Sequence, residues 1–193
     1  MASATIADCW KQIESWLSAN TPEAALSLPP GASPAAFAQA EQVLGYALPG
    51  EVKEFLAIHD GSAGIWLHDR GVFMSLSEIL SAWDQEFDLW GDGNNDEWAT
   101  PAGPIQKKWF ARMWLPILNQ WTGDYVCIDL DPPKGGQPGQ LFQWNHDGGP
   151  ISVIESSLTD LLSEFVTELR NGLYVPKPNR VGKPYLEYLR NEG

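Results

Sequence analysis

Residues 115–131, LPILNQWTGDYVCIDLD, hold two short apolar runs separated by a polar segment with the residues of a turn. The second run, residues 125–130, is rich in β-branched and aromatic side chains, which favour a strand. Gly123 and Asp124 suit a hairpin connection, because glycine adopts positive φ and aspartate bonds to nearby backbone. Pro132 then removes a backbone donor and ends the ladder. The stretch therefore predicts a β-hairpin.

Three aspartates crowd this hairpin and are the first candidates for chemistry. Asp124 belongs to the turn, where aspartate is favoured for backbone reasons. Asp131 stands at the strand end, directly before proline. Asp129 occupies a strand position that either faces solvent or forms a hydrogen bond. We therefore assign the hairpin to the framework of the fold and look elsewhere for function.

Apolar residues at helical spacing predict four helices before the hairpin and one after it. Their starts carry Ser or Pro, the residues that cap or begin helices, and their ends carry Gly or Asn. The expected helices are 5–19; 34–45, capped by Ser33; 49–60, beginning at Pro49; 77–90, capped by Ser77; and 158–170, capped by Ser157.

Short apolar segments broken by turn residues predict the remaining strands. Residues 64–74 are expected to form a strand pair or an extended strand with a turn at 69–71, and further strands are expected at 140–144 and 151–154. Residues 91–104 predict a loop, whereas 105–114 suit either a short helix or an aromatic strand. The tail, 173–193, predicts extended chain ending in a helical turn near Tyr185, Tyr188 and Leu189.

The order of the predicted elements gives the fold class. Helices come first, then antiparallel strands, then a helix, which is α+β rather than the alternation of a parallel α/β sheet. We expect a single domain over residues 1–172, with a mainly antiparallel sheet, helices packed on one side of it, N-terminal helices and a C-terminal helix. Residues 173–193 form a C-terminal extension. A chain of this length buries about 70% of the surface exposed when unfolded.

The charge of the chain narrows the class of partner. It has 25 acidic and 12 basic residues, a formal net charge of −13. This balance argues against a nucleic-acid-binding surface and favours solubility or an electropositive partner. The acids concentrate in residues 71–100, which contain no base.

Cysteine use and the N-terminus bear on location. Cys9 and Cys127 lie far apart without metal-type spacing, so we expect free thiols in a reducing compartment. The N-terminus lacks the pattern of a signal peptide, and no apolar run has the length that spans a bilayer. We expect a cytoplasmic protein with no membrane partner.

Each histidine is followed by aspartate, which raises the alternative of a metal-dependent phosphohydrolase. The pairs begin at His59, His68 and His146. Such a site needs a further His and Asp converging on the ion. All three pairs fall at predicted turns, where Asp and Gly are favoured by the backbone. We therefore expect no metal site.

Other catalytic patterns fail at defined positions. Residues 92–96 begin like a calcium loop, but Glu97 stands where glycine must turn the chain and Gly103 where the bidentate glutamate belongs. No G-x-S-x-G nucleophile elbow occurs, and the glycine-rich segments lack the Gly-Lys-Ser/Thr ending of a phosphate loop. We expect no catalytic residue and no cofactor.

Several short patterns, taken in order, resemble a known family. Residues 41–55 read E-x-x-L-G-x-x-L-P-x-E-x-K-x-F, and the turn Asp60-Gly61 follows. A W-L-P-I strand at 114–117, the pair Gly123-Asp124, an Ile-Asp pair at 128–129 and a closing amphipathic helix at 157–170 complete the order. Over residues 33–170 the chain resembles the SUKH superfamily, which includes the Smi/Knr-type cell-wall assembly regulators.

The resemblance implies an α+β domain without a catalytic constellation. Bacterial relatives commonly act as immunity proteins that neutralise polymorphic toxins, often nucleases, whereas fungal relatives regulate wall synthesis through protein contacts. The chain lacks the long disordered flanks usual in the fungal type, which favours the bacterial interpretation. The family's binding surface varies, so no contact residue is transferred by motif.

Ten tryptophans in 193 residues suggest both a core and a binding surface. Four fall on apolar faces and are expected in the core: Trp10, Trp16, Trp83 and Trp114. Trp66 and Trp144 lie in predicted strands and fit either environment. Trp90, Trp98 and Trp121 lie in or beside polar loops, where aromatic residues among charges are typical of binding hot spots.

The leading hypothesis is a non-catalytic immunity protein that binds a basic protein partner, such as a nuclease toxin. Opposite charge speeds encounter, and buried aromatics supply affinity. The oligomeric state is not set by the sequence. The expected partner-binding residues are Asp84, Asp88, Trp90, Asp92, Asp96, Glu97, Trp98 and Trp121.

Two further functions stay open. Tryptophan with carboxylates also suits sugar rings, which would make the chain a carbohydrate-binding or carbohydrate-active domain. The third hypothesis is a regulatory scaffold of cell-wall synthesis, which requires a partner other than a toxin.

Overall fold

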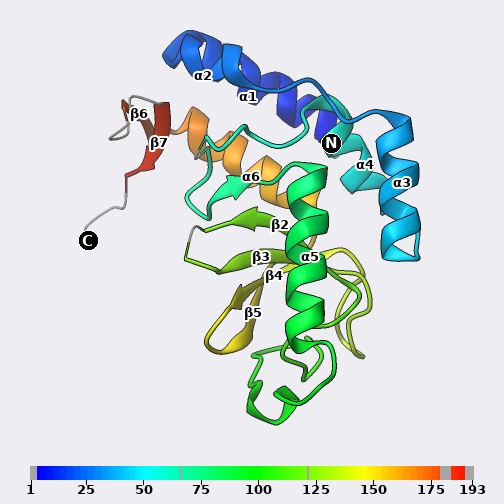
Figure 1. Cartoon of the computed structure of the whole chain (residues 1–193). Coiled ribbons are helices and arrows are strands. Elements are labelled where there is room, and N and C mark those ends of the chain that lie inside the picture. Colours follow the sequence, from blue (N-terminus) through cyan, green and yellow to red (C-terminus); the bar gives the residue numbers. More distant parts are fainter. Residues whose placement is uncertain (1–3, 66, 121, 179–183, 190–193) are drawn as a thin grey trace.

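The computed structural model describes residues 4–65, 67–120, 122–178 and 184–189. Within these residues, six α-helices accompany a five-stranded antiparallel sheet, and a two-stranded hairpin follows the last helix (Figure 1). The expected class is confirmed: the chain is a single α+β domain with N-terminal helices, an antiparallel sheet and a C-terminal helix.

The strands lie in the sheet in the order in which they occur in the chain. They are β1 (Val72–Phe73), β2 (Trp114–Asn119), β3 (Tyr125–Asp129), β4 (Gln140–Asn145) and β5 (Gly149–Glu155). The predicted hairpin is confirmed as β2 and β3, with Trp114 opposite Asp129. The predicted strands at 140–144 and 151–154 are β4 and β5. The described residues of 64–74 supply the two residues of β1 and an isolated bridge between His68 and Gly71, where Gly71 N donates to His68 O at 3.0 Å.

The helices follow the predicted spacing closely. They are α1 (Ile6–Asn20), α2 (Pro22–Ser27), α3 (Pro34–Leu44), α4 (Gly50–Ile58), α5 (Leu76–Trp90) and α6 (Leu158–Arg170). The predicted caps Ser33 and Ser157 are confirmed, because each hydroxyl accepts from a backbone N–H three residues ahead. Gly45 ends α3 with φ of 78°, a conformation that glycine adopts without steric cost.

Three helix starts differ from the prediction. The predicted cap Ser77 is wrong: the Ser75 hydroxyl accepts from Glu78 N, and the Glu78 carboxylate accepts from Ser75 N. This reciprocal capping box places the cap of α5 two residues earlier than predicted. Pro49 is the cap of α4 rather than its first residue. Helix α2, which begins at Pro22, was not predicted because six residues are too few for a periodic pattern.

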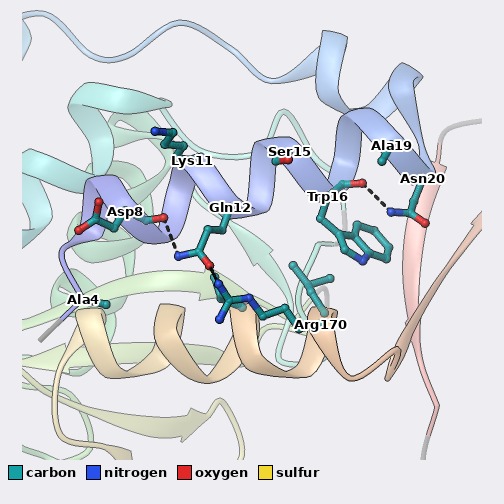
Figure 2. A pocket seen from close by; sticks show the side chains of 11 residues that line it. Ala4, Asp8, Lys11, Gln12, Ser15, Trp16, Ala19, Asn20 and Arg170 are labelled. Atoms are coloured by element: carbon teal, nitrogen blue, oxygen red, sulfur yellow. Dashed lines mark hydrogen bonds between the residues drawn. The ribbon is translucent and has the colours of Figure 1, made fainter. Parts of the chain in front are cut away.

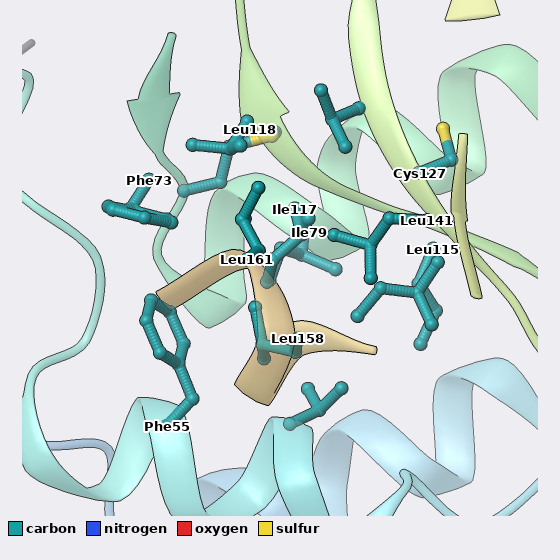
Figure 3. Packing of buried hydrophobic residues seen from close by; sticks show 14 of the residues in the cluster. Phe55, Phe73, Ile79, Leu115, Ile117, Leu118, Cys127, Leu141, Leu158 and Leu161 are labelled. Atoms are coloured by element: carbon teal, nitrogen blue, oxygen red, sulfur yellow. The ribbon is translucent and has the colours of Figure 1, made fainter. Parts of the chain in front are cut away.

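Helices α1, α4 and α6 pack together on one face of the sheet. Leu158 and Leu161 of α6 point toward Leu115, Ile117 and Leu141 of the strands (Figure 3). All of these side chains are at most 1% exposed. Burial of such side chains is worth about 1.5 to 3 kcal/mol each, so this layer is the main stabilising core.

Helix α5 lies across the other face (Figure 1), so the helices are not confined to the one side of the sheet that the sequence predicts. Burial raises the pKa of Tyr125 to about 12 and raises that of Cys127 above its ordinary value. The second cause for both residues is the negative charge of Glu86 on α5. In Figure 3 the Cys127 side chain points away from Leu158 and Leu161. The central strands are therefore covered on both faces, which explains why every residue of β3 is buried.

Residues 105–113 form neither the short helix nor the strand that their composition allowed. They run as turns and bends over the sheet, where Trp144 Nε1 donates to Trp109 O at 2.6 Å. The Phe110 ring meets Trp114 and Trp144 edge-on, with centroids 5.9 and 5.7 Å apart. Side-chain contacts hold most of this segment in place, and at its end Leu130 N donates to Met113 O at 2.9 Å.

The C-terminal tail is also corrected. In place of a helical turn near Tyr185 and Tyr188, the described residues form a hairpin of β6 (Tyr174–Pro178) and β7 (Pro184–Tyr188). Tyr174 packs edge-on against Phe165 of α6, with centroids 5.1 Å apart. An aromatic contact with α6 therefore sets the position of the tail.

Candidate functional site

Helix α5 turns one face to the core and the other to water. Its buried residues are Leu76, Ile79, Ala82, Trp83 and Glu86. Because these recur every three or four residues, the opposite stripe is exposed, and it includes Asp84 and Asp88. The predicted acidic residues of α5 therefore face solvent.

The C-terminal end of α5 carries acidic residues, which are unfavourable there because the helix dipole is negative at that end. Asp84 and Asp88 are four residues apart, as are Asp88 and Asp92, and the last turn of α5, all of which is described, has no basic residue. Like charges at this spacing on one helix, such as Asp84 and Asp88, cost about 0.2 to 0.5 kcal/mol per pair, and an acid near the negative end of the helix dipole costs about 0.3 to 1 kcal/mol. Such violations of local stability are typical of functional surfaces.

The loop after α5 contains a short 3-10 helix, η1 (Asp96–Trp98). The Asp96 carboxylate accepts from Trp109 N at 2.8 Å and lies 3.5 Å from Lys108 Nζ. These contacts fasten the loop to the segment over the sheet. Glu97 is exposed, and Trp98 is 68% exposed.

Trp90 contributes to the framework rather than to the surface. Its Nε1 donates to Glu86 at 3.0 Å, and its ring centroid lies 5.7 Å from that of Trp109. Burial raises the pKa of Glu86, whereas the hydrogen bond from Trp90 lowers it. Of the eight predicted residues, Trp90 and Asp96 thus make internal contacts, five face water, and Trp121 lies outside the described residues, as does Trp66.

Two apolar residues that sequence reasoning missed lie at the same end of the molecule. Leu89 is 54% exposed, and Ile151 of β5 is 41% exposed. Ala102 N donates to Ile151 O at 2.7 Å, which brings the loop alongside β5. Leu89 stands at the border of the buried stripe of α5, so helical spacing alone does not show that it is exposed.

We call this surface the acidic end, and Figure 1 shows it where α5 finishes. It holds three of the six large hydrophobic side chains that are exposed among the described residues. Its members are Asp84, Asp88, Leu89, Asp92, Glu97, Trp98 and Ile151.

The tryptophans expected in the core divide into two groups. Trp10, Trp83 and Trp114 are at most 4% exposed, and Trp16 is only partly buried, on α1. Trp144, which fitted either environment, is fully buried.

The three His-Asp pairs serve separate structural contacts. His59 bonds to Pro29 O at 2.6 Å and to Glu14 at 2.8 Å, whereas the buried His68 lies 2.8 Å from its neighbour Asp69. His146 bonds to Asp124 at 2.8 Å, a contact that raises the pKa of His146. Among the described residues, no group of three or more His, Cys, Asp or Glu side chains is arranged to hold a metal ion.

Both cysteines are buried free thiols. Burial raises the pKa of Cys9 and of Cys127, so both thiols stay protonated and are poor nucleophiles. Among the helices that the structure describes, none is long and apolar enough to cross a membrane.

A family model, described as the SMI1 / KNR4 family (SUKH-1), matches residues 31–164. The match includes α3, α4, α5, the whole five-stranded sheet and the first half of α6. It therefore covers more than half of the chain, including the acidic end.

Fungal regulators are among the relatives. The cell wall biosynthesis/cell cycle regulator smi1 of Schizosaccharomyces pombe is 26% identical over 197 residues, covering 88% of this chain and 37% of the relative. The glucan synthesis regulatory protein of Neurospora crassa is 24% identical, covering 96% and 44%. The cell wall assembly regulator SMI1 of Saccharomyces cerevisiae is 21% identical, covering 84% and 40%. The chain spans about two fifths of the length of these curated relatives.

Proposed function

Because the chain belongs to the SMI1/KNR4 family (SUKH-1), we propose that it is a non-catalytic protein-binding domain with a regulatory role. Its acidic end binds a basic surface of a protein partner. The cellular compartment is a reducing one such as the cytoplasm, because Cys9 and Cys127 are buried without a disulfide.

The observation that carries this proposal is the exposure of Leu89 and Trp98 among carboxylates that form no ion pair with any residue described. Exposed aromatic and large aliphatic side chains become the anchors of an interface once a partner removes them from water. The surrounding charges of Asp88, Asp92 and Glu97 attract a basic surface and set its orientation.

The names of the relatives support the regulatory role. Those of Schizosaccharomyces pombe, Neurospora crassa and Saccharomyces cerevisiae are named as regulators of cell wall biosynthesis, glucan synthesis and cell wall assembly. The chain corresponds to part of each relative, so the role we propose is that of one binding module within such regulation. Its partner would be a basic protein of the wall-synthesis machinery or of its control.

The test is a kinetic binding measurement with a partner recovered by affinity capture and then purified. The triple variant Asp88→Asn, Asp92→Asn, Glu97→Gln should slow association about tenfold at low ionic strength, because electrostatic steering is removed. It should also weaken the salt dependence of association. Trp98→Ala should instead speed dissociation, because it removes an apolar anchor.

The control is Glu23→Gln, which neutralises an exposed carboxylate on α2. Asp96 is left unchanged, because its hydrogen bond from Trp109 N holds the loop. The triple variant removes three charges and the control removes one. If association slows by the same factor for each charge removed in the two proteins, the acidic end is not the binding surface.

A second candidate is neutralisation of a basic toxin such as a nuclease. The excess of 25 acids over 12 bases favours it, because an acidic patch can cover an electropositive nucleic-acid site. Inhibition of a purified nuclease by this chain, lost in the triple variant, would favour this role over regulation. Binding of a glycan by the isolated chain would instead favour the carbohydrate alternative.

A further inference from the structure

A groove of about 820 Å³ runs between α1 and α6 (Figure 2). In Figure 1 these two helices lie far from the C-terminal end of α5. One wall is a stripe of α1 residues spaced by three or four positions from Asp8 to Asn20. The other wall is the last two turns of α6. Since a helix rises 1.5 Å per residue, the α1 stripe is about 18 Å long, or more than three helical turns.

The floor of the groove is apolar, and a hydrogen bond from Arg170 to Gln12 joins its two walls. Trp16 is partly buried there, beside Val166 and Leu169, which are 5% and 3% exposed. Ser15 and Ala19 of α1 are exposed and short, which leaves room above the floor. A ridge of side chains from another helix fits a groove between two helices, which is how helices pack in proteins.

The charges at the groove differ from those of the chain as a whole. Lys11 and Arg170 are exposed there, and neither forms an ion pair with a residue that the structure describes. Arg170 donates instead to the amide oxygen of Gln12 (Figure 2). The nearby Asp8 carboxylate accepts from the Thr5 hydroxyl at 2.8 Å in the cap of α1. Two cations therefore flank an apolar floor in a chain of net charge −13.

We propose that this groove binds an acidic amphipathic helix of a second protein. Its apolar side chains pack on Trp16, Val166 and Leu169, and its carboxylates pair with Lys11 and Arg170. Shape supports a helix, because the α1 wall of the groove extends over the rise of more than three helical turns. Charge supports an acidic one, because the Arg170 guanidinium and the Lys11 ammonium form no ion pair within the described part of the chain.

The consequence goes beyond the proposed function. The groove and the acidic end lie on different elements, α1 with α6 and α5 with its loop, far apart in Figure 1. They also have opposite charge preferences. The domain is then an adaptor that holds a basic partner at one end and an acidic helix at the other.

The experiment uses the whole chain and a designed peptide of about fourteen residues, with leucines at helical spacing and glutamates on both flanks. Calorimetry measures its affinity, and NMR shift changes locate it. Lys11→Glu with Arg170→Glu should weaken binding about tenfold or more, because two attractive pairs become repulsive. Ser15→Trp should block binding by filling the groove while both cations remain.

The matched control is Lys107→Glu with Lys134→Glu, which changes the net charge equally at exposed lysines outside the groove. Thermal unfolding confirms that each variant is folded. The proposal is overturned if a lysine version of the peptide binds equally well, or if the groove variants bind like the control. It is also overturned if vesicles containing phosphatidylserine, and not the acidic peptide, bind through Lys11 and Arg170.

Discussion

The layer around Asp129 and the acidic end use the same side chains, carboxylates with tryptophans, for opposite purposes. Asp129 is fully buried and accepts from Trp114 Nε1 and Gln140 Nε2, both at 3.2 Å. At the acidic end, Asp88 faces water and Trp98 is 68% exposed. The polar groups of the first region are paired with one another inside the protein. In the second region, the carboxylate and the indole are exposed and can contact a partner.

Burial, rather than residue type, separates the two regions. A carboxylate removed from water needs donors at fixed positions, so Asp129 fixes the neighbouring strands β2, β3 and β4 relative to one another. A carboxylate in water needs no such donors, and its electric field can attract a basic partner. Glu86 marks the boundary, because it is buried and bonded to Trp90 only two residues before the exposed Asp88.

The largest expected effect is on stability, from Asp129→Ala. The change leaves Trp114 Nε1 and Asp131 N without an acceptor; Asp131 N donates to Asp129 at 3.1 Å. It also removes one of the two acceptors of Gln140 Nε2, which keeps its bond to Pro104 O at 2.8 Å. We expect a loss of about 3 to 5 kcal/mol in the free energy of unfolding, measured with urea. A loss below about 1 kcal/mol would show that this layer does not depend on its carboxylate.

A smaller effect should appear in the pH dependence of stability. Burial raises the pKa of Asp129 to about 6, from an ordinary value of 3.8. Because the folded carboxyl binds its proton more tightly than the unfolded one, its contribution is fully present below the ordinary value and is lost as the pH rises through about 6. Asp129→Asn cannot titrate, so the wild type should lose about 2 to 3 kcal/mol relative to this variant between about pH 4 and about pH 7.

Parallel unfolding curves for both proteins across this range would contradict the assignment. Glu155, whose pKa burial and the neighbouring Glu164 carboxyl raise to about 7, titrates in the same window. It is present in both proteins, so the difference between them reports Asp129 alone.

The smallest expected effect is at the acidic end and has the opposite sign. Asp88→Asn removes a like-charge pair with Asp84 on α5 and an acid near the end of this helix, at an exposed position. We expect the free energy of unfolding to rise by about 0.3 to 0.8 kcal/mol at low salt, and less at high salt. A loss of stability would place Asp88 in the framework with Asp129.

Local signals in the sequence predicted much of this fold. The hairpin of β2 and β3 follows from turn residues between apolar runs, and Ser33 and Ser157 cap helices because each is the hydroxyl nearest the start of a periodic segment. Ser77 failed as a cap because Ser75 has Glu78 three residues ahead, which completes a reciprocal pair. Residues 105–113 had no local signal, because their conformation depends on rings and indole donors from the distant strand β4.

The candidate site was predicted only in part, because some of its features depend on local sequence and others on contacts between distant segments. The exposure of Asp88 and Glu97 follows from charge in a polar or amphipathic segment. Trp90 and Trp98 have similar sequence surroundings, yet one packs on Trp109 and the other faces water. No sequence pattern indicated that Leu89 and Ile151 are exposed. Exposure of an apolar side chain depends on whether another element of the fold packs over it.

The sequence by itself determined the α+β order, the family, the hairpin and the concentration of acids after residue 71, because these depend on composition and on spacing within single elements. Only the tertiary structure decided which acids and tryptophans are framework and which are surface. Solvent exclusion comes from segments far apart in the chain, as when Trp109 and Asp96 meet above the sheet. The same packing of α1 on α6 forms the groove, which neither helix contains alone.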